Sequence, residues 1–357
     1  MKKEIILASK DELGVGTILK SGRYTIQNVM GLNNFGIKYH ASDKNGDAFV
    51  LKEFFPSEIC VRDGSDVAIV SNESIPEFKS LIHGFLKDAD KLVNLDNPNI
   101  GSILEVFEEN NTAYMVEEVV TGASLLDTVN DPDSELTPQQ ITSILTQLLL
   151  ALHDIHALEL LHRNIEPQNI TLTKDFEPTL FVDFGTFRDK PGRESRAYSK
   201  LASNANKYAP LEMSVESGDQ SPSADIYCMA ASMYFAIMGK PPISNIQRIS
   251  EIAHGNPDPY IRVAGQKVGY KKGFLEALDI ALAPFPRDRI KSATEWLRYL
   301  NVEKVTEETA DTKSLFRPEK ILETYWKIPT TAVRPAIAVT MMVGALFFFL
   351  RLIVNNA

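Results

Sequence analysis

Short runs of alternating apolar and polar residues in the first third of the chain predict a β-sheet. Residues 23–30 alternate with a period of two, and a glycine-containing turn at residues 31–36 leads into a second strand. The sequence Asn-Gly-Asp at residues 45–47 is a hairpin signal that precedes a third strand over residues 48–52. Two further strands follow, the second of them at residues 113–120. We therefore expect five strands in this part.

Helical periodicity appears once among these strands and then dominates the chain. From Ile75 onward, apolar residues recur every three or four positions, which predicts one amphipathic helix between the third and fourth strands. After Gly122 the pattern becomes helical, and residues 137–140 supply an N-cap Thr, a first-turn Pro and a capping-box Gln for a helix that runs to about Leu161. Three more helices are predicted at residues 224–238, 272–282 and 292–300. This order predicts an α+β, bilobal architecture.

The C-terminal stretch carries a different pattern. Residues 335–350 contain no charged side chain, and the apolar run extends to residue 354. Twenty helical residues at about 1.5 Å each span about 30 Å, the thickness of a bilayer core. We expect a single transmembrane helix over residues 335–354, with Lys327 and Arg334 holding the preceding part in the cytoplasm. The alternative is a buried terminal helix, which the absence of a polar face disfavours.

Composition narrows the class of protein further. The chain has 357 residues, a formal net charge of -10 and 24% charged residues, so no basic surface balances a nucleic-acid backbone. We expect no nucleic-acid partner. Cys60 and Cys228 are far apart and match no metal spacing, and we interpret both as buried thiols. Residues 302–334 are polar and of mixed charge, as expected for a linker; a short interfacial helix at residues 321–326 is the alternative to a solvated segment there.

Candidate chemistry is concentrated in two short runs. Residues 162–169 read His-Arg-Asn-Ile-Glu-Pro-Gln-Asn, and residues 182–185 read Val-Asp-Phe-Gly. Other characteristic segments follow the same order: Phe-Gly-Ile-Lys-Tyr at 35–39, Leu-Lys-Glu-Phe-Phe-Pro at 51–56, Lys-Tyr-Ala-Pro-Leu-Glu at 207–212, Asp-Ile-Tyr at 225–227 and Arg-Asp-Arg at 287–289. From residue 22 to residue 300 this order resembles the protein kinase superfamily, and most closely the bacterial membrane-associated Ser/Thr protein kinases.

The resemblance implies a division of the chain. It consists of an N-terminal extension (1–21), a kinase-like N-lobe (22–120), a kinase-like C-lobe (121–301), a juxtamembrane linker (302–334) and the transmembrane helix (335–354). The resemblance also implies framework contacts. Glu212 should pair with Arg289, Asp225 should hold the backbone of the 162–169 loop, and His162 and Phe184 should pack into the core.

By the same resemblance, a set of residues would contact nucleotide. Lys52 corresponds to the lysine that neutralises the inner phosphates, and its helical partner is Asp88 in place of the usual Glu. Asn169 and Asp183 correspond to the two Mg ligands. The candidate cofactor-binding positions are Lys52, Asp88, Gly31, Gly36, Glu118, Asn169 and Asp183. ATP and Mg are the candidate cofactors, and the alternative is that these residues persist as a polar network without a ligand.

Two exchanges in the 162–169 loop depart from the family pattern. Asn164 stands where a kinase has its catalytic Asp, and general-base assistance of that kind is worth about 10²–10⁴-fold. Glu166 stands where a kinase has a phosphate-directed Lys, and a carboxylate there would repel phosphate by roughly 1–4 kcal/mol at about 4 Å. These exchanges argue against efficient phosphotransfer.

The adenine site is altered as well. Asn33 replaces the middle glycine of the 31–36 turn, Lys38 replaces an apolar residue above the base, and Glu117 occupies the position behind the pocket. A buried charge must find a partner, which suggests the hypothesis that Lys38 and Glu117 pair across the cavity. The alternative is that Lys38 points outward.

The sequence therefore favours a membrane-anchored, catalytically impaired pseudokinase that acts as a signalling scaffold or conformational switch. It would bind the lipid bilayer through residues 335–354 and a protein partner through its kinase-like body. Residues 185–209 carry serines beside basic residues and are either a phosphorylation-controlled segment or an unmodified loop. The alternatives are an atypical active Ser/Thr kinase in which Glu166 compensates for Asn164, a nucleotide sensor without transfer, and a membrane structural protein.

Overall fold

The computed structural model describes residues 11–33, 35–182, 207–213, 220–271 and 273–300. All of them belong to one compact unit that extends from residue 1 to residue 310. Asp183, Phe184, residues 185–206 of the serine-containing segment, and residues 321–326 and 335–354 lie outside the described residues. Among the residues that are described, no helix has the length and apolar character needed to cross a membrane.

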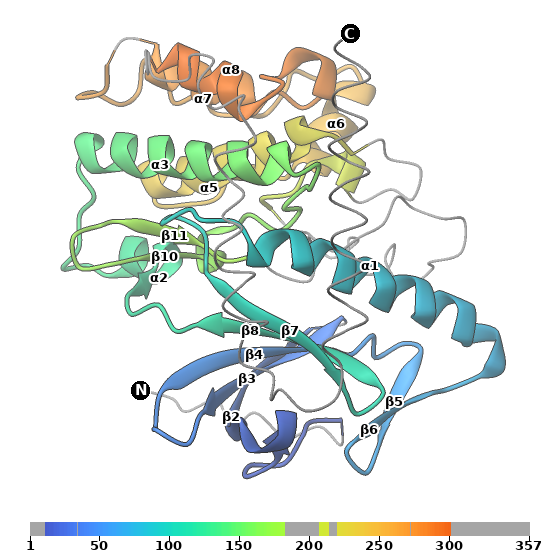
Figure 1. Cartoon of the computed structure of the whole chain (residues 1–357). Helices are drawn as coiled ribbons and strands as arrows, with labels where there is room; N and C mark the ends of the chain where they lie inside the picture. Colours follow the sequence, from blue (N-terminus) through green and yellow to red (C-terminus); the bar gives the residue numbers. More distant parts are fainter. Residues whose placement is uncertain (1–10, 34, 183–206, 214–219, 272, 301–357) are drawn as a thin grey trace, which may run out of the picture. The chain divides into compact units, whose positions relative to one another are not determined.

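The predicted sheet is present, with its five main strands as expected and one short strand added. Its order is β1-β2-β3-β4-β8-β7 and every neighbouring pair is antiparallel. The strands are β1 (Ile18–Leu19), β2 (Tyr24–Asn33), β3 (Gly36–Ser42), β4 (Ala48–Phe54), β7 (Ile103–Glu109) and β8 (Thr112–Glu118) (Figure 1). The β3–β4 hairpin turns at the predicted residues, where Asp43 accepts backbone N–H bonds from Asn45 and Asp47.

A second, two-stranded hairpin follows β4 and was not predicted. It consists of β5 (Cys60–Asp63) and β6 (Asp66–Ile69), joined at Gly64, which has a positive φ of 62°. Helix α1 (Ile75–Val93) comes next and lies alongside β7 and β8 (Figure 1). Phe78 and Phe85 on the buried face of α1 contact Phe54 of β4, with ring centroids 5.7 and 5.4 Å apart. These contacts fix α1 on the sheet that carries Lys52.

The rest of the described chain is mainly helical, as predicted. Its helices are α2 (Leu125–Asn130), α3 (Pro138–Ala157), α5 (Pro222–Met238), α6 (Asn245–Ala253), α7 (Phe274–Ala281) and α8 (Ala293–Tyr299). Between them lies a small sheet, β11-β10-β9, formed by β9 (Ala123–Ser124), β10 (Ile170–Leu172) and β11 (Pro178–Leu180). Helix α5 is buried on nearly every side; α3 and α7 pack against it, and α8 packs against α3 and α7.

The prediction for α3 was right at the N-terminus of the helix and wrong at its C-terminus. The predicted capping box is present, because Thr137 accepts from the Gln140 N–H and the Gln140 side chain accepts from Thr137. The predicted end near Leu161 was wrong, since the helix stops at Ala157 and Glu159 adopts a left-handed φ of 59°. This turn redirects the chain into the 162–169 loop.

Candidate active site

Asp225, in the first turn of α5, holds the backbone of the 162–169 loop. Asp225 is 0% exposed and accepts the backbone N–H of His162 at 2.8 Å and that of Arg163 at 2.7 Å. Its carboxylate also lies 2.8 Å from Nε2 of His156. Burial alone would raise the pKa of Asp225, but the bonds from His156 and from the loop backbone hold that pKa below its ordinary value. The expected framework role of Asp225 is confirmed.

A buried ion pair stabilises the helical half next to this loop. The two terminal guanidinium nitrogens of Arg289, Nη1 and Nη2, donate to the carboxylate of Glu212, Nη2 at 3.3 Å. The Nε of Arg289 donates to the carbonyl of Ala283 at 2.7 Å, and the guanidinium lies over the ring of Tyr227 with 4.8 Å to the centroid. The Glu212–Arg289 pair predicted from the resemblance is therefore confirmed.

The loop itself brings Asn164, Glu166 and Asn169 together. The Asn169 side-chain amide donates to the Asn164 carbonyl at 3.0 Å and to the Glu166 carboxylate at 3.3 Å. Gln168 also donates to that carboxylate, at 2.5 Å, and the Asn164 backbone N–H lies 3.3 Å from Nδ1 of His162. Because the Asn169 Nδ2 makes these bonds, its side-chain oxygen is left as the atom that can ligate a cation. The exchanged residues therefore sit inside an ordered loop.

Glu166 also acts on a neighbouring segment of the chain. Burial, and next the negative charge of Glu166, raises the pKa of the Tyr208 phenol above its ordinary value. The carboxylate is therefore close enough to affect an element that follows it by about forty residues in sequence. A kinase-type lysine at this position would put positive charge where this chain puts negative charge.

The lysine of β4 has a partner that the sequence did not predict. The Nζ of Lys52 lies 2.6 Å from Oε1 of Glu117 on β8, and the two side chains are 2% and 1% exposed. Lys52 also donates to the carbonyl oxygen of Val182, the residue before Asp183. Lys52 thus forms an ion pair with Glu117, and the expected pairing with Asp88 of α1 stays a prediction. The Asp side chain is one methylene shorter than the usual Glu, and Glu117 offers a carboxylate from an adjacent strand.

Strand register explains the choice of partner. Lys52 is directly opposite Lys38 on β3 and opposite Met115 on β8, while Glu117 is opposite Val50. Because side chains alternate between faces, Lys38, Lys52 and Glu117 share one face of the sheet, and Glu117 is the diagonal neighbour of Lys52. Lys38 is half-buried and lies one strand farther from Glu117. The suggested Lys38–Glu117 pair stays a prediction.

The glycine positions of the β2–β3 turn differ in what surrounds them. Gly36 is buried and pairs with Phe54, whereas a Cβ added at Gly31 would meet nothing within 4 Å. Gly31 therefore leaves open space beside the strand. Glu118, the last residue of β8, is exposed, and its N–H binds the carbonyl of Ser102 at 3.1 Å.

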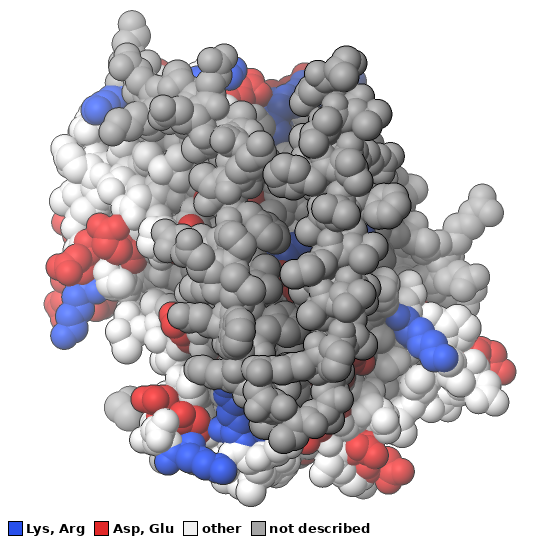
Figure 2. All heavy atoms as spheres, in the orientation of Figure 1, with Lys and Arg blue, Asp and Glu red and all other residues white. Residues whose placement is uncertain are grey.

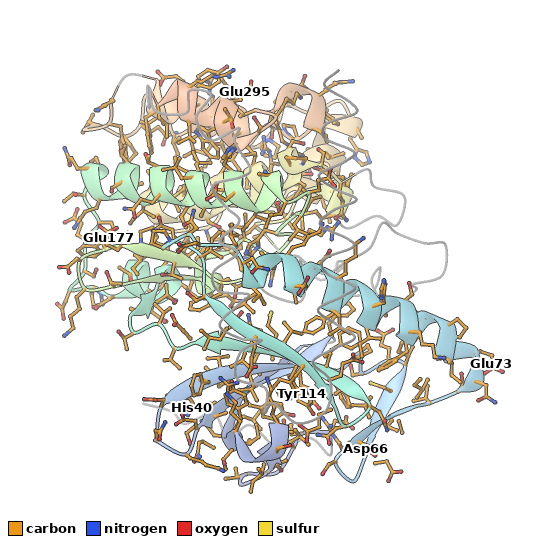
Figure 3. The ribbon with its side chains drawn as sticks, viewed as in Figure 1. His40, Asp66, Glu73, Tyr114, Glu177 and Glu295 are labelled. Atoms are coloured by element: carbon orange, nitrogen blue, oxygen red, sulfur yellow. The ribbon has the colours of Figure 1, made fainter. Side chains whose placement is uncertain are left out.

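Sequence reasoning missed a second buried carboxylate, that of Glu53. Glu53 is 0% exposed and accepts bonds from Tyr39 and Tyr114, both at 2.7 Å, and from two nitrogens of Arg62 at 2.8 and 2.5 Å. Figure 3 shows Tyr114 among the strands of the sheet. Arg62 also donates to the Asp11 carbonyl at 2.8 Å, so this network ties the N-terminal residues, β5 and the sheet together. The available signal was the alternation that places residue 53 on the opposite face from Lys52.

The residues present fit a magnesium–nucleotide only in part. Asn169 has a side-chain oxygen that could ligate a cation, but Lys52 is bound to Glu117, and Glu166 is negative where the resemblance implies a phosphate-directed lysine. No group of three or more His, Cys, Asp or Glu side chains suited to a metal occurs among the described residues. On the face shown in Figure 2, the described Lys and Arg side chains lie in small groups mixed with Asp and Glu.

Comparisons with known proteins agree with this geometry. The family described as "Protein kinase domain" matches residues 61–269. Serine/threonine-protein kinase C of Synechocystis is 25% identical over 285 residues, which cover 77% of this chain and 49% of that protein. Serine/threonine-protein kinase F of the same organism is 27% identical over 301 residues, which cover 80% and 56%. The chain thus spans about half the length of these curated relatives.

A solved structure extends the likeness to three dimensions. The structure described as "PpkA-294 apo form" is 27% identical, superposes with a TM-score of 0.64, and covers 81% of this chain and 99% of its own. The sheet, α1 and the helical half are therefore arranged as in that structure.

Proposed function

Because this chain belongs to the protein kinase domain family, we propose that it is a membrane-anchored pseudokinase that acts as a signalling scaffold or conformational switch. Kinases of this family generally use ATP and Mg, which supply the phosphoryl group and neutralise its charge. In this chain the framework contacts of Asp225 with the loop and of Glu212 with Arg289 are kept, while two side chains that would assist transfer are exchanged. A protein partner that recognises the kinase-like body would receive the signal.

The observation that carries the proposal is the ordered 162–169 loop. Asp225 accepts hydrogen bonds from the backbone of this loop, and the Asn169 side chain donates to the Asn164 carbonyl. These bonds hold the loop segment that carries the catalytic base in a kinase. An Asn amide at that position cannot accept the proton of a substrate hydroxyl, because its nitrogen carries no free lone pair and its oxygen is only weakly basic. Glu166, two residues later, adds negative charge beside it. The loop is thus a well-formed support without its proton acceptor.

One observation favours the runner-up, an atypical active kinase. The Glu166 carboxylate lies 3.3 Å from Nδ2 of Asn169, so it stands beside the candidate cation ligand. A carboxylate there has the chemistry to accept a proton or to bind a hard cation. In that case Glu166 would take over the role that Asn164 has lost.

Membrane anchoring is the part of the proposal that rests on sequence alone. The uncharged run from residue 335 to residue 350 and its basic flank support a single-pass anchor with the kinase-like domain in the cytoplasm. The test is fractionation of cells that express the full chain, followed by an alkaline carbonate wash. Retention of the full chain in the pellet, and loss of retention when residues 335–357 are deleted, is the expected result. Release of the full chain by carbonate would refute the anchor.

A transfer assay separates pseudokinase from enzyme. Full chain in nanodiscs is incubated with labelled ATP and Mg or Mn, alongside the variants Glu166→Gln and Asp183→Ala. The pseudokinase account expects the three proteins to give the same background. Label transfer by the wild type that disappears in both variants establishes the active alternative.

A thermal-shift titration then separates a nucleotide sensor from a nucleotide-independent scaffold. A ligand at 100 times its dissociation constant stabilises the folded state by about 2.7 kcal/mol. A shift with millimolar ATP in the absence of transfer identifies a sensor. No shift leaves the scaffold function alone.

A further inference from the structure

By the resemblance, Lys52 is the residue with which a family member would meet phosphate, and here it is paired with Glu117. The two atoms are 2.6 Å apart and both side chains are at most 2% exposed, so water screens the pair little. Lys52 is additionally bound to the Val182 carbonyl, so two acceptors satisfy its ammonium group. A phosphate that recruits Lys52 must compete with the buried carboxylate of Glu117 for the ammonium group, and separating a buried ion pair is costly.

The strand register places Glu117 on the same face of the sheet as two lysines. Lys38 and Lys52 are direct cross-strand neighbours on one face, an arrangement that is destabilising for like charges. Glu117 is the diagonal neighbour of Lys52 on the other side and supplies the negative charge that this face requires. The carboxylate of Glu117 therefore balances charge on this face of the sheet in the protein without ligand.

From these contacts we propose that Glu117 sets ligand specificity at Lys52: it holds Lys52 away from phosphate, so that this site selects uncharged nucleosides over nucleoside di- and triphosphates. A neutral ligand leaves the Lys52–Glu117 pair intact. A charged phosphate chain competes with Glu117 for Lys52 and is repelled by the same carboxylate. The inference rests on the proposed function only for the location of the ligand, since it concerns binding and not transfer.

The test measures binding to the full chain in nanodiscs by isothermal titration, with adenosine and Mg·ATP as the probes. The variants are Glu117→Gln, which removes the charge at nearly constant shape, and Glu117→Met, which removes the hydrogen-bonding group as well. The matched control is Glu108→Gln, the same exchange at an exposed position of β7. Melting temperatures of all variants show that each is folded.

The expected result is specific to phosphate. Glu117→Gln tightens Mg·ATP binding at least tenfold, about 1.4 kcal/mol, while adenosine binding and the Glu108→Gln control stay within about twofold of wild type on that same scale. The gain disappears in the double variant Lys52→Met/Glu117→Met, because the released lysine is the source of the added affinity. If Glu117→Gln does not fold, the comparison of Glu117→Met with the double variant gives the same answer.

Two outcomes overturn the inference. One is an unchanged affinity for Mg·ATP, including no measurable binding, in both single variants. The other is an equal gain for adenosine and Mg·ATP, which would mean that Glu117 only fills space. The transfer assay described above is independent of these results. Phosphotransfer by the wild type would refute the pseudokinase proposal while a phosphate-specific gain in Glu117→Gln still stood.

Discussion

Removal of the Arg62 side chain tests the buried network around Glu53. Arg62→Met keeps an apolar chain of similar length and deletes both guanidinium bonds to Glu53, at 2.8 and 2.5 Å. Burial disfavours the charged guanidinium, but its bonds to Glu53 more than offset this and raise the Arg62 pKa. The two side chains are 4% and 0% exposed, so the pair is a buried one.

The magnitude follows from this burial. Breaking a buried pair by removing one partner costs about 3–5 kcal/mol, because the remaining charge is left uncompensated. For a domain of this size each kcal/mol lowers the melting temperature by roughly 2–4 °C, so we expect a drop of roughly 6–20 °C. The hydroxyls of Tyr39 and Tyr114 still donate to Glu53 and keep the loss from being larger. The contact of Arg62 with the Asp11 carbonyl is lost as well.

The assay is thermal unfolding of the full chain followed by circular dichroism. Arg298→Met is the matched control, since Arg298 is an exposed residue of α8. The double variant Arg62→Met/Glu53→Gln should recover part of the loss, because it removes the orphaned charge. A melting temperature of Arg62→Met equal to that of Arg298→Met would refute the reasoning.

Three further predictions concern other parts of the fold. Because the pKa of Asp225 is lowered in the folded protein, its charge stabilises the fold at pH values above its ordinary pKa of about 3.8, and this contribution is lost as pH falls through the lowered pKa of the folded state. Asp225→Asn should therefore lower the urea midpoint more at pH 7 than near pH 3. Burial raises the pKa of Cys60 to about 12 and that of Cys228 well above its ordinary value. At pH 8 Ellman's reagent should therefore label both thiols only at the rate of unfolding. Immediate labelling of the native protein would contradict this. A Cβ at Gly122 would lie 2.3 Å from the Leu172 carbonyl oxygen. Gly122→Ala should therefore lower the free energy of unfolding by about 1–3 kcal/mol in urea titrations. A Cβ at Gly31 would meet nothing within 4 Å, so Gly31→Ala should not destabilise the fold.

The features that the sequence predicted well depend on nearby residues. The capping box of α3 involves two residues three positions apart, and the strands of the main sheet are visible in local alternation. The Glu212–Arg289 pair was found only through the family resemblance, because nothing local connects residues 77 positions apart. The β5–β6 hairpin was missed although its turn contains an Asp-Gly pair, since each strand has only four residues.

The partner of Lys52 illustrates what sequence reasoning could not supply. The sequence identified Lys52, Lys38 and Glu117 as charged residues of one cavity, but not the alignment of β3, β4 and β8. A slip of one residue in any of these pairings would move a side chain to the opposite face. The observed register, with Lys38 opposite Lys52 and Glu117 opposite Val50, puts Lys52 on the strand next to Glu117 and Lys38 one strand beyond it.

The most direct test of the central claim is to restore the exchanged side chains of the loop. Single-turnover label transfer from saturating Mg·ATP is measured for the full chain and for the variant Asn164→Asp/Glu166→Lys. If the missing proton acceptor and the misplaced carboxylate limit the chemistry, the wild type stays at background and the restored variant gains at least about 10²-fold. Magnesium-dependent transfer by the wild type at the rate of the restored variant would contradict the account.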